Sequence, residues 1–490
     1  MDKPNILLIT TDTSRCDTLA CYGNPRWPEG PISPNLDRLA AEGVTFENAH
    51  TSSPVCMPAR VSLLTGVHTP VHGAIENGIE RRTHLTVFPD LLKAQGYTNI
   101  LVGKAHFGPV PASFDVQRVL QGEKNSGSHD FYAHHLRAHG YSRATNHPNP
   151  VPEDLFSEAF LVDTTIQEIE RAVNEKREPF FAFCSMLSPH EPFDPPGRWA
   201  NLYDNRSLPP LNYSPGDLAC QPVHLRRLLG YLGQEDASPA FPDGEPDHAR
   251  IDACRRLYYG LAAYCDAQIG RLLSYLDERG LRENTLVIYT SDHGTALFDH
   301  GFADKHNFYD ETWRVPLIMS LPGTLPRGER RDFAIWNDLT ATILAAAGTS
   351  CPTVQGFDLF TPLRDGRESP RRAAVATLYK SCALATKRWK LEYYFEEGTG
   401  RLFDRETDPR EQTDLYAVPD YREVRDALRH ALLTWRADLL DVQDLQASTT
   451  ANEQRGGPVA RRMSVYTRQM RGSDAEQRLN ERVERIDSLR

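Results

Sequence analysis

Short, continuous apolar runs recur through the first part of the chain, and each is typical of a strand buried on both faces of a parallel sheet. These runs cover residues 5–9, 98–102, 179–186 and 285–290. Segments with helical spacing of apolar residues, or with helix start and stop signals, alternate with the runs. These segments cover residues 33–43, 87–94, 155–174, 252–276 and 336–347. The alternation predicts a large α/β domain.

The pattern changes after residue 355. Short strands joined by turns are predicted over residues 374–379, 382–386 and 389–395, and an amphipathic helix over 421–440. The residues from 446 onward are polar and charged, which is typical either of a disordered tail or of an arm for homo-oligomer formation. We therefore divide the chain into an α/β domain (1–355), a smaller α+β subdomain (356–445) and a charged tail or oligomer arm (446–490).

Two polar stretches interrupt the predicted elements. We interpret residues 112–152 as an insertion near the functional site, where they form a substrate-binding loop, and residues 208–246 as a surface excursion.

Length and composition are those of a soluble globular protein. The 490 residues suggest one large domain and a smaller partner. Hydrophobic residues make up 40% and charged residues 25%, as in ordinary globular enzymes. The net charge of −11 argues against nucleic acid or an anionic membrane as a partner, although a local basic pocket can still bind an anionic substrate.

The cysteines and the start of the chain predict a cellular location. Nine cysteines, an odd number without metal-finger or CxxC spacing, indicate mostly reduced thiols. Residues 1–4 run directly into a predicted strand, without a basic and apolar leader, and no apolar run reaches transmembrane length. We therefore expect a cytoplasmic protein.

Polar side chains follow several of the predicted strands. Ligands of open α/β sheets bind beyond the carboxyl ends of the strands, so these side chains are predicted to share one site. An Asp beside a His also offers an oxygen and a nitrogen ligand for a metal. Taken singly, each has an ordinary alternative as a turn cap, a solvated surface charge or a loop histidine. The residues are Asp12, Lys104, His106, His190, Asp292 and His293.

Cys56 lies just before a predicted short apolar helix that contains Arg60. A side chain at a helix N-terminus lies near unpaired N–H groups and the positive end of the helix dipole, and Arg60, one turn later, adds a positive charge. An anion would be held there. From these residues alone, Cys56 is either a half-buried structural cysteine or a thiolate nucleophile.

Residues 56–60, Cys-Met-Pro-Ala-Arg, resemble the Cys-x-Pro-x-Arg signature of the sulfatase family, part of the alkaline phosphatase superfamily. Residues 103–106 are similar to the family's Gly-Lys-x-His, residues 189–193 to its Pro-His-x-Pro-Phe, and residues 291–294 with Lys305 to its second signature block. The resemblance implies an alkaline-phosphatase-like fold: a large mixed, mostly parallel sheet sandwiched by helices, followed by a smaller subdomain of antiparallel strands and a helix.

The resemblance also implies the chemistry. In the family the cysteine at the position of Cys56 is converted to formylglycine, and the hydrated aldehyde is the nucleophile; one hydroxyl attacks sulfur, and deprotonation of the other expels sulfate. A formylglycine-generating enzyme is therefore an implied partner. Arg60 is implied to hold the hydrate. The implied ligands of one divalent metal are Asp12, Asp292 and His293.

The remaining roles are carried over in the same way. Lys104 is implied to bind oxygens of the hydrate or of the sulfate, and His106 to be the base that breaks down the sulfated intermediate. His190 and Lys305 are implied to contact the sulfate and are candidates to protonate the leaving group. Asn77 is a weaker candidate for a substrate contact.

The sequence departs from the commonest family pattern at two positions. Thr13 follows Asp12, and His293 follows Asp292, where many sulfatases have Asp-Asp and Asp-Asn. An imidazole ligand suits Mn²⁺ or Zn²⁺ better than Ca²⁺. The Asp-His pair is similar to that of phosphonate monoester hydrolases and phosphodiesterases of the same superfamily. Ca²⁺ remains our first choice of metal, and Mn²⁺ the next.

Three functions remain open at this point. The first is a sulfuric ester hydrolase that acts on a small sulfated carbohydrate or similar metabolite. The second is a phosphonate monoester or phosphodiester hydrolase. The third is a binding or scaffold protein with an inactive site, against which the complete set of ligands and cations argues.

Overall fold

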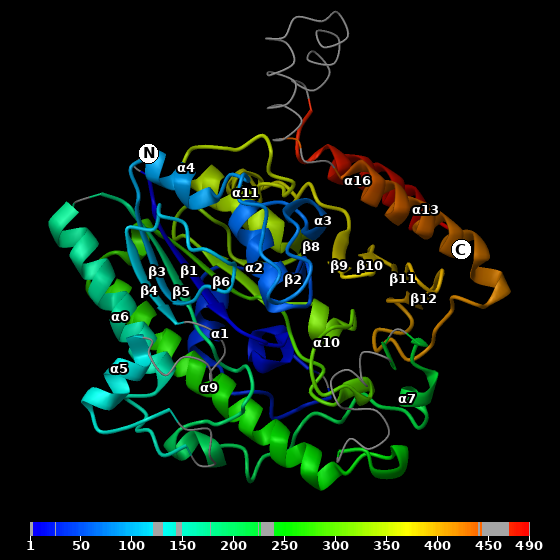
Figure 1. Cartoon of the computed structure of the whole chain (residues 1–490), viewed down its shortest axis with the longest axis horizontal. Coiled ribbons are helices and arrows are strands. Elements are labelled where there is room, and N and C mark those ends of the chain that lie inside the picture. The colour runs from blue at the N-terminus through cyan, green and yellow to red at the C-terminus, as the bar shows by residue number, and fades with distance from the viewer. Residues whose placement is uncertain are drawn as a thin grey trace, which may run out of the picture.

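Eight strands form one sheet in the computed structural model, which describes residues 3–24, 26–120, 131–143, 149–176, 178–223, 225–226, 240–439, 442 and 470–489 (Figure 1). The strand order is β4-β3-β5-β1-β6-β7-β2-β8. Neighbouring strands are parallel except at β7, which is antiparallel to both β6 and β2. The predicted mixed, mostly parallel sheet is confirmed. The strands are β1 (Asn5–Thr11), β2 (Val44–His50), β3 (Thr98–Lys104), β4 (Val116–Leu120), β5 (Phe180–Ser185), β6 (Thr285–Ser291), β7 (Leu317–Ser320) and β8 (Gly328–Ile335).

The central strands are apolar throughout because both faces of the sheet are covered. In β1, Leu7 and Ile9 point into one hydrophobic cluster, whereas Ile6 and Leu8 point into another on the opposite face. This alternation follows from the two-residue period of a strand. The predicted runs at β1, β3, β5 and β6 are confirmed within two residues, and the polar stretch 112–152 contains the additional edge strand β4.

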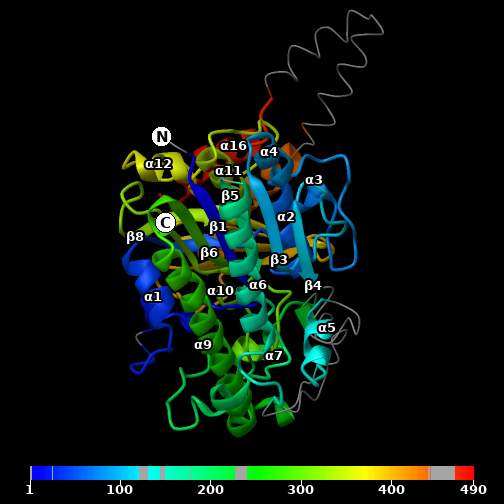
Figure 2. The same ribbon diagram turned by 90° about the vertical axis from the view of Figure 1, so that its left-hand side faces the viewer.

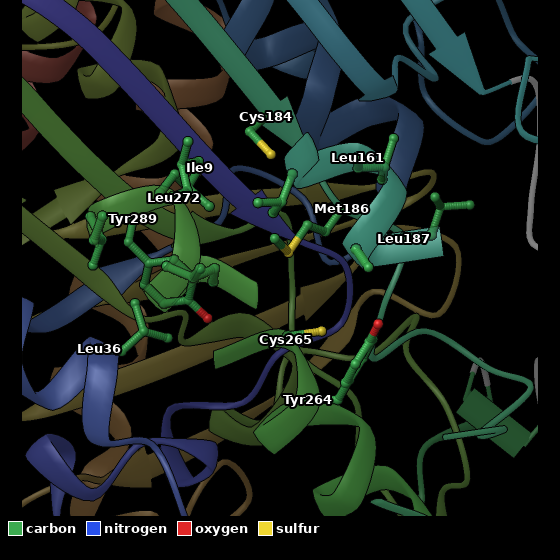
Figure 3. Close-up of a cluster of buried hydrophobic side chains, with 14 of the residues drawn as sticks. Ile9, Leu36, Leu161, Cys184, Met186, Leu187, Tyr264, Cys265, Leu272 and Tyr289 are labelled. Carbon is green, nitrogen blue, oxygen red and sulfur yellow. The ribbon is translucent and has the colours of Figure 1, made fainter. Parts of the chain in front are cut away.

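Helices cover the two faces of the sheet. One face packs against α1 (Pro34–Ala41), α6 (Ser157–Arg171) and α9 (His248–Glu278). Figure 2 shows α6 and α9 side by side in front of the strands. Figure 3 shows the core beneath them, where Leu36 and Leu272 lie with Ile9 and Tyr289 of the sheet.

The opposite face packs against α2 (Cys56–Thr65), α4 (Phe88–Ala94) and α11 (Trp336–Ala346). The other helices before the second sheet are short, apart from α5, which lies in the predicted insertion. They are α3 (Thr69–His72), α5 (Phe131–Ala138), α7 (Asp217–Cys220), α10 (Asp310–Trp313) and α12 (Phe360–Arg364). No helix among the described residues combines the length and apolar character needed to cross a bilayer.

The C-terminal region forms a second, antiparallel sheet of order β12-β11-β10-β9, covered by α13 (Arg422–Asp438) (Figure 1). This α+β architecture is as predicted, whereas the division of the chain at residue 355 stays a prediction. The strands are β9 (Ala374–Leu378), β10 (Ser381–Ala385), β11 (Trp389–Tyr394) and β12 (Thr399–Asp404).

The end of the chain is a docked helix and not a free tail. Helix α16 (Asp474–Ile486) packs against α13 (Figure 1). Its buried residues include Leu479 and Val483, which belong to the core of the second sheet. The prediction of a disordered tail is therefore wrong for residues 470–489, whereas an oligomer arm stays a prediction; residues 446–469 lie outside the described part of the chain. The helix was missed because its apolar positions stand among many charges.

Glu476 of α16 ties this helix to the large domain. Its carboxylate accepts hydrogen bonds from Trp435 Nε1 of α13 at 2.6 Å and from His68 Nε2 at 2.8 Å. It also forms an ion pair with Arg371, which in turn donates to Asp338 of α11. All of these side chains are buried, so the start of α3 is joined to α11, α13 and α16 by one polar network.

Candidate active site

The candidate site lies where the parallel strands end, as predicted. Asp12 directly follows β1, Lys104 is the last residue of β3, and Asp292 directly follows β6. Cys56 is the first residue of α2. These side chains meet because β3 and β6 flank β1 and β5 in the sheet and because α2 begins at the same edge.

Four of the buried side chains could hold a metal ion. One ligand atom from each of Asp12, Cys56, Asp292 and His293 lies within 4.8 Å of the others. His293 Nδ1 lies 2.8 Å from the Gly294 carbonyl, so Nδ1 carries a proton and donates it, and Nε2 faces the centre of the group, 3.0 Å from Cys56 Sγ. Two carboxylates and an imidazole nitrogen fixed in this way fit a divalent cation.

Arg60 fixes the carboxylates of this group. Its Nε donates to Asp292 Oδ2 at 2.8 Å, and its Nη1 donates to Ser185 Oγ at 2.7 Å. The buried Nη2 has no hydrogen-bond partner among the described residues and lies 3.6 Å from Asp12 Oδ2. A guanidinium donor that is buried without a partner, beside Asp12 and Asp292, can bind an oxygen atom of a bound group.

The charges around Cys56 favour an anion. Lys104 donates a hydrogen bond to Asp12, and although burial lowers the pKa of this lysine, Asp12 and Cys56 outweigh that effect and raise it. Burial raises the pKa of the Cys56 thiol, but Lys104, Lys305 and His293 together lower it well below its usual value. The site therefore stabilises negative charge at residue 56.

His106 also faces the Cys56 thiol and contributes to lowering its pKa. The His106 backbone has a φ of 47°, which is uncommon for a residue other than glycine. Its Nδ1 is buried without a hydrogen-bond partner among the described residues. The ring can therefore accept or hold a proton next to residue 56.

His190 and Lys305 form a second pair at the site. His190 Nδ1 lies 2.8 Å from the Glu191 carbonyl and therefore carries a proton, while its Nε2 accepts a hydrogen bond from Lys305 Nζ at 2.9 Å. Burial lowers the pKa of Lys305, but Asp304 and Cys56 outweigh burial and raise it well above its usual value. Lys305 is thus a buried cation in contact with the His190 ring. Burial and Lys305 lower the pKa of His190, but Asp12 and Glu191 outweigh them and raise it.

The second sheet holds the loop that carries Lys305. Tyr309 of this loop stacks on His300 with ring centroids 3.6 Å apart. Arg401 of β12 donates to the Tyr309 hydroxyl and forms an ion pair with Glu392 at 2.7 Å. Sequence reasoning missed these residues because Tyr309 and Arg401 lie 92 positions apart and belong to different sheets.

Asn77 and Ser185 have contacts that were not predicted from the sequence, and the substrate contact of Asn77 stays a prediction. Asn77, predicted as a weaker substrate contact, caps the first turn of α2, because its Oδ1 accepts a hydrogen bond from the Met57 backbone at 3.0 Å. Ser185, the partner of Arg60, was not selected from the sequence. The signal that could have found it is a hydroxyl at the carboxyl end of an otherwise apolar strand.

Comparison with known proteins agrees with this geometry. The sulfatase family model matches residues 4–349, and the model of the N-sulphoglucosamine sulphohydrolase C-terminal region matches residues 298–438. The chain is 30% identical over 482 residues to an arylsulfatase of Clostridium perfringens, an alignment that covers 88% of this chain and 94% of that protein. It is 26% identical over 493 residues to an N-acetylglucosamine-6-O-sulfatase of Bacteroides thetaiotaomicron, with 88% and 86% covered. The fold is similar to that of the phosphonate monoester hydrolase of Agrobacterium radiobacter, with a TM-score of 0.75 at 25% identity over 89% of this chain and 96% of the other.

Proposed function

We propose, on the premise that the chain belongs to the sulfatase family of the alkaline phosphatase superfamily, that it releases sulfate from a small sulfated carbohydrate or similar metabolite. One observation carries this proposal: Cys56, at the start of α2, lies among two carboxylates, an imidazole and three cationic side chains. The similarity to an N-acetylglucosamine-6-O-sulfatase supports a carbohydrate ester.

The residues fit the two groups that the family implies. Converted to formylglycine, residue 56 supplies a hydrated aldehyde as nucleophile, and a divalent cation held by Asp12, Asp292 and His293 supplies positive charge beside it. The unpartnered Nη2 of Arg60 is placed to hold an oxygen of residue 56. Lys104, a cation beside Asp12, is placed to bind a sulfate oxygen.

The groups proposed to transfer protons are His106 and the pair formed by His190 and Lys305. His106 takes up the proton whose loss from residue 56 releases the bound sulfate. Lys305 donates to His190 Nε2, so the pair is able to deliver a proton to the oxygen of the leaving alcohol. Lys305 remains cationic despite its burial, because Asp304 and Cys56 raise its pKa, so the pair holds a proton near neutral pH.

We expect His190→Gln to affect esters of poorly leaving alcohols most. General acid catalysis is worth about 100-fold or more for such alcohols, and an acidic phenol needs it much less. The kcat/KM for an alkyl sulfate should therefore fall about 100-fold, and that for 4-nitrophenyl sulfate less than about ten-fold. The exposed His430, replaced by Gln, is the matched control. Equal losses on both esters would contradict a role in protonating the leaving group.

For the metal, Ca²⁺ is our first choice and Mn²⁺ the second. The two carboxylates are typical ligands of Ca²⁺, whereas the His293 imidazole favours binding of Mn²⁺. Seven of the cysteines whose side chains are described, Cys265 apart, are free thiols, which supports a reducing compartment such as the cytoplasm.

Hydrolysis of phosphonate monoesters or phosphodiesters is the second candidate function. The pairing of Asp292 with His293 and the fold similarity to a phosphonate monoester hydrolase favour it. Rates on matched sulfate, phosphonate and phosphodiester substrates, with Ca²⁺ or Mn²⁺ added, decide between the two candidates.

The test of the nucleophile is the mass of the tryptic peptide 39–60. We expect protein produced together with a formylglycine-generating enzyme to have lost the sulfur of Cys56 and gained an aldehyde. A peptide that keeps its thiol under these conditions, in a protein that still hydrolyses sulfate esters, would contradict the proposed nucleophile and point to the thiolate. The variant Cys56→Ala, which should be inactive, is the control for contaminating sulfatase.

A further inference from the structure

Glu76 and His306 form a polar pair beside the site. Glu76 precedes Asn77, the residue that caps α2, and His306 follows Lys305. His306 Nε2 lies 3.4 Å from Glu76 Oε1, and the His306 backbone N–H donates to the Pro54 carbonyl at 3.4 Å. The pair therefore bridges the loop that leads into Cys56 and the loop that carries Lys305.

Exposure places the pair between the buried centre and solvent. The Lys305 side chain is 4% exposed, whereas the side chains of His306 and Glu76 are 15% and 37% exposed. His190 and Lys305 lie on the side of the leaving alcohol if they protonate it. If the alcohol part extends from there toward solvent, it meets His306 and Glu76, the more exposed residues next to Lys305.

One carboxylate oxygen of Glu76 is available to accept a hydrogen bond. Its Oε1 accepts a hydrogen bond from the Asn77 backbone at 2.8 Å, while Oε2 has no partner among the described residues. Burial raises the pKa of Glu76, but the hydrogen bond with His306 outweighs this and lowers it, so the side chain is anionic near neutral pH. A carboxylate repels a sulfate group, so its ligand is another part of the substrate.

We propose that Glu76, oriented by His306, determines specificity by accepting a hydrogen bond from a hydroxyl or ammonium group on the alcohol part of the ester. This inference rests on the proposed function and narrows its substrate to polyols, sugars and amino sugars. Glu76 is a binding residue in this scheme, and His306 is a positioning residue. A site built to bond a donor discriminates against an analogue that lacks it, because the buried acceptor is left without a partner.

The test compares a donor-bearing and a donor-free ester in the metal-loaded, formylglycine-containing enzyme. The probes are glucosamine 6-sulfate and 4-nitrophenyl sulfate. For Glu76→Gln we expect the ratio of kcat/KM for the first to that for the second to fall about ten-fold, mainly through KM, since a charge-assisted hydrogen bond is lost. Glu80→Gln, an exposed position on the same loop, should leave the ratio unchanged.

His306→Asn tests the positioning role. Asn tolerates the φ of 70° at this position, but its shorter side chain cannot reach Glu76. We expect a smaller fall in the same ratio, and no further fall when this change is added to Glu76→Gln, because the two residues act as a unit. Equal losses on both probes would overturn the inference and assign Glu76 to supporting Asn77 and α2 instead.

The experiment distinguishes a failure of the proposed function from a failure of the inference about Glu76. If the enzyme hydrolyses phosphonate monoesters but not sulfate esters, the proposed function is wrong, and the same variants are compared on the glyceryl and phenyl esters of one phosphonate. A ten-fold fall in the glyceryl-to-phenyl ratio would then still support Glu76 as the acceptor, and an unchanged ratio would overturn it. If the wild-type protein turns over neither class and Cys56→Ala binds neither glucosamine 6-sulfate nor 4-nitrophenyl sulfate in calorimetry, both are overturned.

Discussion

Asp292→Asn should lower kcat/KM for sulfate esters about 1,000-fold. Asp292 offers one oxygen to the metal group and binds Arg60 Nε through the other at 2.8 Å. Its Oδ1 is further held by the backbone N–H groups of Thr13 and His293, at 3.3 and 3.0 Å. Asn has the same shape but no charge, so it weakens the cation site and leaves the Arg60 guanidinium less well neutralised.

The measurement is steady-state turnover with Ca²⁺ or Mn²⁺ in excess, together with the metal content of the purified protein. The exposed Asp90 on α4, replaced by Asn, is the matched control. Full metal content and wild-type turnover in Asp292→Asn would remove Asp292 from the proposed ligand set. Lost metal with retained turnover would show that hydrolysis does not depend on the cation.

Glu476→Gln should destabilise the protein by about 3 kcal/mol at pH 7. Although burial raises the pKa of Glu476, Arg371 and His68 outweigh it and lower this pKa from 4.5 to about 2. Gln imitates the protonated acid, so the substitution removes the stabilisation that the ionised carboxylate provides. Removing one partner of a buried ion pair has a similar cost, because the remaining charge stays buried.

The pH dependence of this effect has a definite sign. Because the folded pKa of Glu476 lies below the unfolded value, its contribution is fully present above pH 4.5 and is lost as the pH falls toward 2. The difference in unfolding free energy between the wild type and Glu476→Gln, measured by urea denaturation, should shrink over that range. Glu484→Gln is the control on the same helix: Glu484 is 61% exposed, so its pair with Arg372 is worth less than about 1 kcal/mol. Similar effects of the two substitutions would contradict this account of Glu476.

The strand ends could be predicted from sequence because local signals specify them. A buried parallel strand is a continuous apolar run, and the first polar residues after it reach the carboxyl edge of the sheet. Asp12, Lys104 and Asp292 were selected on this basis, and the structure brings them together with Cys56. Their roles in catalysis stay predictions.

Contacts between segments far apart in the sequence could not be predicted, because no local sequence pattern marks them. The hydrogen bond from Arg401 to Tyr309 and the network around Glu476 join elements that are far apart in sequence. A charged residue considered alone is interpreted as a solvated surface residue, so these contacts were not predicted. Helix α16 was missed for the same reason, since only a few apolar residues mark its buried face. The cap that Asn77 forms on α2 depends on a loop conformation that the sequence alone does not specify.

The burial of Cys56 dictates an order of events during protein synthesis. The thiol has no exposed surface, and His293, which contacts it, is added to the growing chain 237 residues later. A modifying enzyme can reach this thiol only before β6 and the following loop have packed against β1. The proposed conversion of Cys56 therefore has to take place while the chain is still being made or before it folds, and the speed of folding limits how much of the protein becomes active.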